Sequence, residues 1–213
     1  MIIRGLILFI LLTHSIAWAG QGMGPGPGFV VAVGGGGGGV TITDDFNRAD
    51  ENPLAAPWTQ IHTFNKPRLV DQALRSTEFP TAWAYYNQAV ADDQFAQIKM
   101  SALSSDNGVT LRSNSGRNAL ENIGYSVMYN DGNILIRKWT LDFFTNLNSV
   151  SATGLIVAGD ILRGEISGST ITAKVNGATV LTATDSTYAS GFVGISVKGQ
   201  YGDEVDDFQG GDL

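Results

Sequence analysis

The 213-residue sequence contains no cysteine. This absence excludes disulfide bonds, thiol nucleophiles, cysteine-ligated zinc sites, iron–sulfur clusters and a lipid anchor attached through a cysteine. The fold must therefore be held by apolar packing alone, and a chain of this length can bury a core large enough for that.

Histidine is almost as scarce, since His14 and His62 are the two instances. His14 lies in an apolar N-terminal stretch, so His62 alone remains as a candidate base. We interpret it as a packing residue near Trp58 and Phe64. The sequence also has no Gly-x-Ser-x-Gly nucleophile motif and no phosphate-binding loop that ends in Gly-Lys-Ser/Thr. These absences remove the familiar signatures of hydrolases and nucleotide-binding proteins.

Basic residues are in the minority, with 13 Lys and Arg against 20 Asp and Glu and a net charge of −7. Proteins bind nucleic acids by displacing counterions from phosphates with Lys and Arg. We therefore expect no nucleic-acid partner. The negative charge also favours solubility and weakens adhesion to anionic membranes.

The longest apolar run lies at the N-terminus, where Met1–Arg4 is basic, Gly5–Leu12 is apolar and Ala17–Ala19 offers small residues for cleavage. This order predicts a signal peptide at 1–19. The run is shorter than the roughly 20 residues of a membrane-spanning helix. We expect a secreted protein, extracellular or periplasmic, with no membrane insertion after cleavage; an uncleaved anchor is the alternative.

Residues 20–39 form a low-complexity segment that ends in six consecutive glycines, Gly34–Gly39. Such a run has too much backbone entropy to fold alone and predicts a flexible linker. The apolar segment Phe29–Val33 interrupts it. This segment has three further interpretations: a strand added to this domain, a strand added to a neighbouring molecule, or a docking peptide.

From Val40 to Leu213 the sequence predicts one all-β domain. Short runs of Val, Ile, Thr and aromatic residues alternate with polar residues between turn signals. Helix signals are confined to Ala89–Gln97 and Arg117–Asn122, and the pattern favours a two-layer or closed antiparallel architecture. The predicted strands are Val40–Phe46, Ala82–Tyr86, Phe95–Leu103, Val109–Arg112, Tyr125–Tyr129, Asn133–Trp139, Asp160–Ile166, Thr170–Val175, Thr179–Thr184, Phe192–Val197 and Glu204–Phe208.

Two hairpins are well marked in this region. The segment Asn130–Asn133 separates two of the predicted strands, and Asn176-Gly177 separates two others. Asn-Gly and Asp-Gly pairs readily adopt the positive φ angles of a type I′ turn, so we predict tight antiparallel hairpins at both places.

Several of these segments, in this order, resemble concanavalin A-like lectin/glucanase domains of the laminin-G-like type. The matching segments are Thr43–Asp50 with Pro53-Leu54 and Trp58, Gly108–Arg112, Gly124–Trp139, Asp160–Arg163, Val175–Gly177, Asp185, Gly191–Gly194 and Val205–Phe208. The resemblance implies a jelly-roll β-sandwich whose first and last strands lie side by side. Members of that superfamily bind glycans, adhere to surfaces or hydrolyse polysaccharides, and the fold does not choose among these activities.

Catalytic carboxylates are hard to find in this sequence. Retaining glycosidases need two carboxyl groups about 5–5.5 Å apart, and laminarinase-like members of the superfamily carry them as Glu-x-Asp-x-x-Glu. The nearest match begins at Glu204, but Gln209 occupies the position of the second Glu. Since Gln cannot ionise, we interpret the segment as structural and predict no catalytic residue.

Sugar rings are held by aromatic faces together with polar side chains that bind the hydroxyls. Two clusters offer this mixture, one on the strand that contains Trp83 and Tyr85 and the other on the central hairpin. The alternative for each Trp is a position in the core between the sheets. The predicted ligand-binding residues are Trp83, Tyr85, Arg112, Tyr125, Arg137 and Trp139.

Calcium is the one cofactor that the sequence suggests. If the resemblance holds, Asp44 and Asp45 lie on a strand next to that of Asp206 and Asp207. Calcium prefers several oxygen ligands, carboxylates included. A structural calcium site at these four residues is therefore a hypothesis, and loop-capping aspartates are the alternative.

Three functions remain open at this point. The first is a secreted, non-catalytic module that binds a carbohydrate or another cell-surface polymer. The second is a structural or adhesive subunit of a surface assembly, filament or phage virion, with self-assembly through the Phe29–Val33 segment. The third is a divergent glycoside hydrolase.

Overall fold

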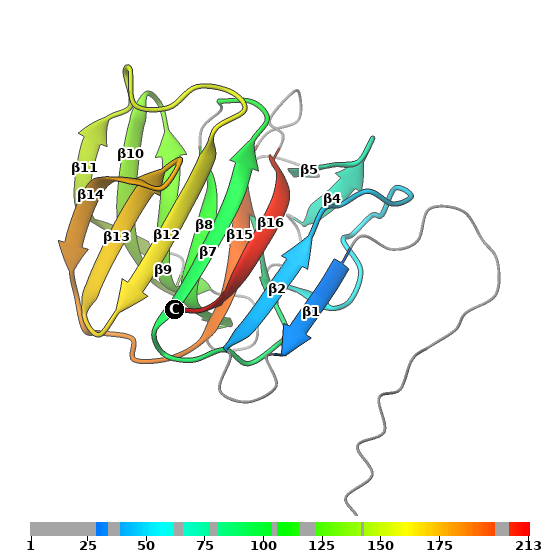
Figure 1. The fold of residues 1–213 in the computed structure, drawn as a ribbon, viewed down its shortest axis with the longest axis horizontal. Helices are drawn as coiled ribbons and strands as arrows, with labels where there is room; N and C mark the ends of the chain where they lie inside the picture. Colours follow the sequence, from blue (N-terminus) through cyan, green and yellow to red (C-terminus); the bar gives the residue numbers. More distant parts are fainter. Residues whose placement is uncertain are drawn as a thin grey trace, which may run out of the picture.

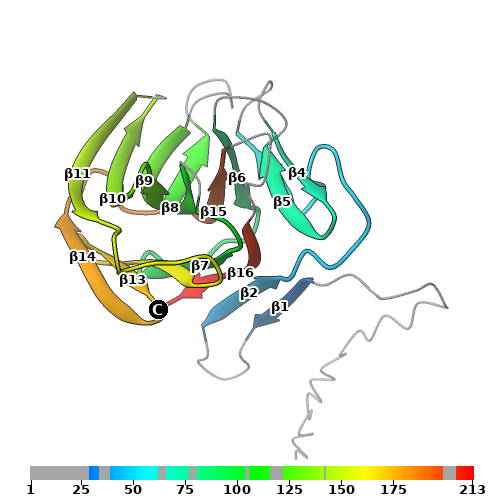
Figure 2. The same ribbon diagram turned by 90° about the horizontal axis from the view of Figure 1, so that it is seen from above.

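The computed structural model describes residues 29–33, 39–61, 66–76, 81–103, 106–115, 122–141, 143–198 and 205–213. The predicted signal peptide and most of the predicted linker, residues 20–28 and 34–38, lie outside this range, as does His62. Within the described residues all regular structure is β-strand, and two antiparallel sheets stack as a sandwich (Figures 1 and 2). The described part of the chain contains no helix that is long and apolar enough to cross a membrane.

Sheet A is nine-stranded, with a main path in the order β1-β2-β16-β7-β12-β13-β14, and the β4–β5 hairpin joins it where β5 pairs with β16. Its strands are β1 (Phe29–Val33), β2 (Val40–Asp44), β4 (Pro67–Val70), β5 (Ala73–Ser76), β7 (Gln94–Met100), β12 (Ile161–Ser167), β13 (Thr170–Val175), β14 (Ala178–Thr184) and β16 (Val205–Asp212).

Sheet B is seven-stranded, in the order β11-β10-β9-β8-β15-β6-β3. Its strands are β3 (Trp58–Gln60), β6 (Ala82–Tyr86), β8 (Asn107–Ser115), β9 (Asn122–Asn130), β10 (Asn133–Thr140), β11 (Phe143–Ser151) and β15 (Phe192–Val197). The all-β jelly-roll prediction is therefore confirmed. The helical turn expected within Ala89–Gln97 is wrong, because Gln94 begins strand β7. Most of the other expected helical turn lies outside the described residues.

The two ends of the folded domain lie side by side, as predicted. Strand β2 pairs antiparallel with β16, with Asp44 opposite Phe208. The Trp58 ring packs between the rings of Phe46 and Phe208, at centroid distances of 6.0 and 4.9 Å. Of the interpretations of Phe29–Val33, the structure has the strand added to this domain, since β1 pairs with β2 at the edge of sheet A.

Both predicted hairpins are present with the expected turn chemistry. Asn130 pairs with Asn133 across Asp131 and Gly132, whose φ angles are 45° and 80°. The β13–β14 hairpin turns at Asn176-Gly177, whose φ angles are 48° and 83°. Positive φ at both central residues defines a type I′ turn, which matches the twist of the flanking strands.

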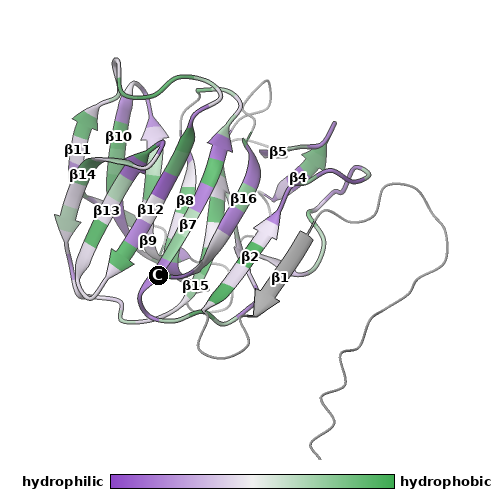
Figure 3. Ribbon diagram, viewed as in Figure 1, coloured by the Kyte–Doolittle hydropathy of each residue, from purple (hydrophilic) through white to green (hydrophobic). Residues whose placement is uncertain are grey.

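The main core lies between the sheets, and alternate residues of most strands point into it. Hydropathy accordingly changes from residue to residue along many strands in Figure 3. Burial of these apolar side chains replaces the missing disulfides as the source of stability. The largest fully buried residues of the chain include Tyr86, Tyr125, Phe46, Phe208, Leu69, Leu74, Ile98, Met100 and Leu111.

Candidate functional site

A second hydrophobic cluster lies on the outer face of sheet B, away from the core between the sheets. Its centre is formed by Trp83 on β6 and Trp139 on β10, which are 3% and 9% exposed. Tyr85 packs against it, and the remaining buried members are Ile61, Met128 and Leu135. We refer to these six residues as the aromatic cluster.

The contact between the two tryptophans reveals the shape of this face. Strands β6 and β10 are four positions apart in the sheet, which corresponds to about 19 Å in a flat sheet at the usual strand spacing. The rings of Trp83 and Trp139 nevertheless meet edge-to-face with centroids 4.6 Å apart. Two side chains can bridge that separation only if the sheet curves toward them. The outer face of sheet B is therefore concave.

Small residues form the floor beneath the tryptophans. The intervening strands contribute Gly108, Thr110, Ser126, Gly194 and Ser196, which alternate with residues of the main core. A Cβ atom at Gly108 would lie 2.6 Å from Met128 Cα, so this position requires glycine. The indole Nε1 of Trp139 donates a hydrogen bond to Ser126 Oγ at 2.8 Å, which fixes the ring on the floor.

More accessible aromatic rings lie on either side of the tryptophan pair. Tyr85 and Phe192 stack with ring centroids 4.8 Å apart and an interplanar angle of 16°. On the β11 side, Phe144 is 51% exposed and its ring centroid lies 5.3 Å from that of Trp139. The Arg137 guanidinium lies over Phe144, at 4.3 Å from the ring centroid.

A charged group borders one end of the concave face, centred on Asp106. Its carboxylate accepts hydrogen bonds from Arg137 Nη1 and Lys198 Nζ, both at 3.0 Å. Thr81 and Asn130 also donate to it. Arg137 further donates through Nε to Asn146 Oδ1 at 2.9 Å. These hydrogen bonds hold both the cation and the carboxylate in fixed positions beside the aromatic rings.

The structure brings together four of the six predicted ligand-binding residues: Trp83, Tyr85, Arg137 and Trp139. Tyr125 does not join them. It is 1% exposed, points into the main core, and donates a hydrogen bond to Asp185 at 2.7 Å. Burial, and then the hydrogen bond to Asp185, raise the pKa of Tyr125 to about 12. The two tryptophans belong neither to the main core nor to an open surface, because each covers the other.

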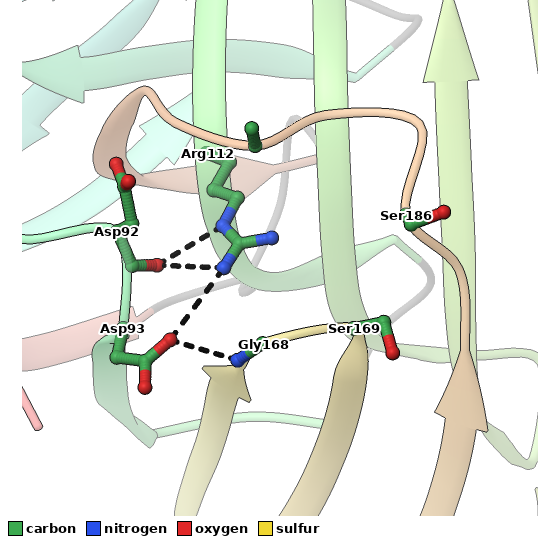
Figure 4. A pocket seen from close by; sticks show the side chains of 7 residues that line it. Asp92, Asp93, Arg112, Gly168, Ser169 and Ser186 are labelled. Carbon is green, nitrogen blue, oxygen red and sulfur yellow. Dashed lines mark hydrogen bonds and ion pairs between the residues drawn. The ribbon is translucent and has the colours of Figure 1, made fainter.

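Arg112 is also separate from the aromatic cluster. Its side chain is 3% exposed and lines a pocket of about 370 Å³ between loops at one end of the sandwich (Figure 4). The guanidinium donates through Nε and Nη2 to the carbonyl oxygen of Asp92, at 3.0 and 2.9 Å, and through Nη1 to that of Tyr188 at 2.9 Å. Arg112 therefore ties two loops to strand β8.

The four aspartates of the calcium hypothesis have other partners. Asp44 is 1% exposed and accepts hydrogen bonds from Trp58 Nε1 at 2.7 Å and from Arg48 Nη1 at 2.6 Å. Asp45 accepts one from the backbone N–H of Asn47. Lys99 Nζ lies 3.9 Å from Asp206 and 3.3 Å from Asp207. Across the described residues, no three His, Cys, Asp or Glu side chains gather closely enough to hold a metal ion.

Three residues of the concave face were missed by the sequence analysis: Phe144, Phe192 and Asp106. Phe144 lies on β11, a strand without alternating hydrophobicity. Phe192 begins a strand that was predicted, and its outward position follows from the inward position of Val193. Asp106 precedes strand β8 at a positive φ of 61°. Nothing in its sequence context distinguishes it from an ordinary turn aspartate.

Sequence comparisons find no relative: no family model matches the chain, and the search of the curated proteins gives no significant match. Similar solved structures do exist. The carbohydrate-binding module CBM66 from Bacillus subtilis is 13% identical, with a TM-score of 0.52, over 73% of this chain and 92% of that chain. The carbohydrate recognition domain of Emp46p, in a metal-free form, is 9% identical, with a TM-score of 0.52, over 79% and 94%.

The exoplasmic/lumenal domain of VIP36, in a Ca²⁺/Man3GlcNAc-bound form, is 12% identical, with a TM-score of 0.52, over 73% of this chain and 85% of that chain. At these identities the likeness concerns the fold. The chain has a concanavalin A-like jelly-roll fold, as the sequence resemblance predicted.

Proposed function

We propose that this concanavalin A-like jelly roll is a non-catalytic module that binds carbohydrate across the concave outer face of sheet B. One observation carries the proposal: aromatic side chains gather on the outer face of a sheet whose inner face already supplies the core. In a sandwich the outer positions of each strand are normally polar. Aromatic rings on the outer face do not help to join the two sheets, whereas they pack well against the C–H surface of a sugar ring.

The tryptophan pair forms a rigid support, and the more accessible aromatic residues beside it contact the sugar. Phe144 lies on one side and is 51% exposed, and the half-buried Tyr85–Phe192 stack lies on the other. We expect Arg137 and Asp106 to form hydrogen bonds with hydroxyl groups of the sugar, since the positions of both side chains are fixed before a ligand binds. Ordered polar groups of this kind reduce the entropy lost on binding.

The structural neighbours support this ligand class. One is a carbohydrate-binding module, one is a carbohydrate recognition domain, and one was solved with Man3GlcNAc bound. The first test is a direct binding measurement on a panel of polysaccharides and immobilised glycans.

A divergent glycoside hydrolase remains the alternative to a pure binding module. Hydrolysis with retention needs two carboxyl groups about 5–5.5 Å apart. Among the described residues, Asp106 is the carboxylate that borders the concave face, and Arg137 and Lys198 both neutralise it. This favours binding without cleavage. New reducing ends released from any bound polysaccharide would favour the hydrolase.

We further propose that the module acts outside the cytoplasm after removal of residues 1–19, on the basis of the signal-peptide pattern. The pairing of β1 with β2 of the same chain favours a binding module over an assembly subunit. Deletion of residues 20–39 also removes strand β1, so its thermal midpoint is measured first; in a variant that stays folded, assembly through that segment would be lost while glycan binding on sheet B would persist.

Phe144 and Phe143 provide a matched pair of variants for the concave face. Adjacent residues of a strand point to opposite sides, and of the two it is Phe144 that contacts Trp139 and Arg137. Phe143 is 80% exposed. We expect Phe144→Ala to weaken glycan binding by roughly ten- to a hundred-fold, as for an aromatic residue at the centre of an interface. Phe143→Ala should keep the affinity of the unaltered protein.

Isothermal titration calorimetry with the best ligand of the panel measures both affinities. Thermal midpoints of the two variants show whether any loss comes from unfolding. Equal affinity of the two variants, with both folded, would show that the ligand lies elsewhere.

A further inference from the structure

The pocket beside Arg112 is distinct from the concave face and shares no residue with the aromatic cluster. Its volume of about 370 Å³ falls within the range of known small-molecule sites. Three connections form its walls: the loop between β6 and β7, the turn between β12 and β13, and the loop between β14 and β15. The lining residues are Asp92, Asp93, Arg112, Gly168, Ser169, Ser186 and Ala189.

The walls of the pocket are held in place by hydrogen bonds that range from buried to exposed. Arg112 binds the Asp92 and Tyr188 carbonyls, and its own backbone N–H donates to Gln94 Oε1 at 2.8 Å. Asp93 fixes the third connection, because its carboxylate accepts from Gly168 N and Ser167 Oγ, both at 2.8 Å. A pocket with fixed walls loses little conformational entropy when a ligand enters.

Arg112 retains hydrogen-bonding capacity that its partners do not use. A guanidinium carries five N–H groups, and three are directed at the two carbonyl oxygens. Asp93 Oδ1 lies 3.8 Å from Nη2, which is an ion-pair distance. Figure 4 shows the guanidinium between the two aspartates on one side and the two serines on the other. A second N–H on Nη1 is therefore available for an acceptor atom of a ligand.

The charges that line the pocket limit what this acceptor can be. Asp93 contributes one carboxylate against the single cation of Arg112, whereas Asp92 turns its carbonyl oxygen toward the guanidinium and its carboxylate away from it (Figure 4). The hydrogen bonds from Gly168 and Ser167 lower the pKa of Asp93, so it is ionised at neutral pH. The Arg112 cation is therefore already balanced by Asp93, and an anionic ligand would bring a second negative charge beside that carboxylate. Uncharged oxygens, such as those of hydroxyl groups, satisfy the arginine without that penalty.

We propose that this pocket binds a single uncharged sugar residue, such as the end of a glycan chain. Its hydroxyl oxygens accept from Arg112, and its hydroxyl protons are donated to the serine and aspartate oxygens of the wall. Gly168 and Ala189 leave room for the ring because they have little or no side chain. The ligand class rests on the proposed function, whereas the position of the site does not.

A variant that fills the pocket tests this proposal without removing any of its hydrogen bonds. Ala189 is exposed and small, so Ala189→Trp should occupy the space and leave the fold intact. The matched control is Ala178→Trp, which changes an exposed alanine beside the turn at the opposite end of the sandwich. Ser186→Ala provides a second variant of the pocket, which removes one hydroxyl group of the wall.

The measurement is an NMR titration of the full mature chain with glucose, galactose, mannose, N-acetylglucosamine and fructose, and with glucuronate as the anionic comparator. We expect millimolar affinity for at least one neutral sugar, with shifts at the amides of Gly168, Ser169 and Ser186. Ala189→Trp should weaken it by about tenfold or more. Ser186→Ala should weaken it several-fold, and Ala178→Trp should have no effect.

Three results would overturn the proposal. In the first, no neutral sugar shifts these amides, and in the second, Ala189→Trp binds as well as Ala178→Trp does. The third is tighter binding of glucuronate than of glucose, because the ligand would then be an anion. Phe144→Ala separates this test from the proposed function. It should leave monosaccharide binding in the pocket unchanged even where polysaccharide binding on the concave face is lost.

Discussion

The outer faces of the two sheets differ in the type of side chain that they carry. The outer face of sheet A carries an ion-pair group in which Glu165 accepts from Arg163 at 2.6 Å and contacts Lys174 Nζ at 2.7 Å. Arg163 also donates to Gln97 and lies over the Phe95 ring at 3.8 Å. The outer face of sheet B instead buries two tryptophans over a floor of small residues.

Sheet A follows the usual pattern of a sandwich, with apolar residues inside and charged residues outside, and the one aromatic ring named above on its outer face, Phe95, is covered by Arg163. Sheet B departs from it, because it packs apolar side chains on both of its faces. The aromatic cluster therefore adds to the stability supplied by the main core, and its more accessible neighbours Phe144, Tyr85 and Phe192 are the residues that the proposed binding role requires. The difference in packing can be tested by substitutions at equivalent positions on the two faces.

Removal of a tryptophan should have the largest effect. Trp83→Ala deletes a nearly buried ring that contacts Trp139, and such truncations cost about 3–5 kcal/mol of unfolding free energy. Lys174→Ala on sheet A removes a surface ion pair and should cost about 1 kcal/mol or less. Urea unfolding followed by circular dichroism measures both. Similar losses in the two variants would show that the aromatic cluster is not a packed core.

Loss of the hydroxyl beneath Trp139 should have an intermediate effect. Ser126→Ala leaves the buried indole Nε1 without its acceptor, at a cost of about 1–3 kcal/mol. Thr172→Ala, on the outer face of sheet A, should change stability by no more than about 0.5 kcal/mol.

A double-mutant cycle with Trp139→Phe isolates the hydrogen bond, because phenylalanine has no N–H to satisfy. The cost of Ser126→Ala should shrink in that background. An unchanged cost would mean that the hydroxyl stabilises the protein in some other way.

The smallest effect is a pH dependence that belongs to sheet A. Burial raises the pKa of Glu165, but hydrogen bonds from Lys174 and Arg163 outweigh it and hold the pKa below its usual range. A lowered folded-state pKa stabilises the fold above the unfolded value of about 4.3. That contribution, about 1 kcal/mol at most for such a pair, is lost as the pH falls through the folded-state pKa.

Glu165→Gln cannot ionise and should lose less stability than the unaltered protein between neutral and acid pH. Thermal unfolding across that range gives both curves. Parallel curves would show that the ion-pair group contributes nothing. Trp83→Ala serves as the comparison from sheet B, and it should lower stability about equally at every pH.

Most strands of the domain were predictable because their buried and exposed residues alternate. Strand β11 (Phe143–Ser151) was not, since it forms an edge of sheet B and is exposed or half-buried throughout. An edge strand has no need of a regular apolar face, so the period-two signal is lost. The short strands β3, β4 and β5 were missed for a different reason: three or four residues are too few to show a period.

The separation of Tyr125 from Arg137 follows from the turn of their hairpin. The Asp131-Gly132 turn makes Asn130 pair with Asn133, and this fixes the register of the whole hairpin. Arg137 then lies opposite Ser126, and Tyr125 lies opposite Lys138. Tyr125 therefore points to the face opposite Arg137. A two-residue turn specifies the face of every residue in its hairpin. The turn alone therefore excludes Tyr125 from a site that contains Arg137.

The sequence by itself determined the all-β class and the two type I′ hairpins, because these depend on alternation and turn residues, and the family resemblance implied that β2 and β16 are adjacent. Only the tertiary structure decided that Trp83 and Trp139 meet across the three intervening strands, and that Arg112 lies in a separate pocket between loops. The physical reason is that both outcomes depend on how far the sheet curves and where distant loops end. Curvature is a sum of small twists over many residues, and no single residue carries a signal for it.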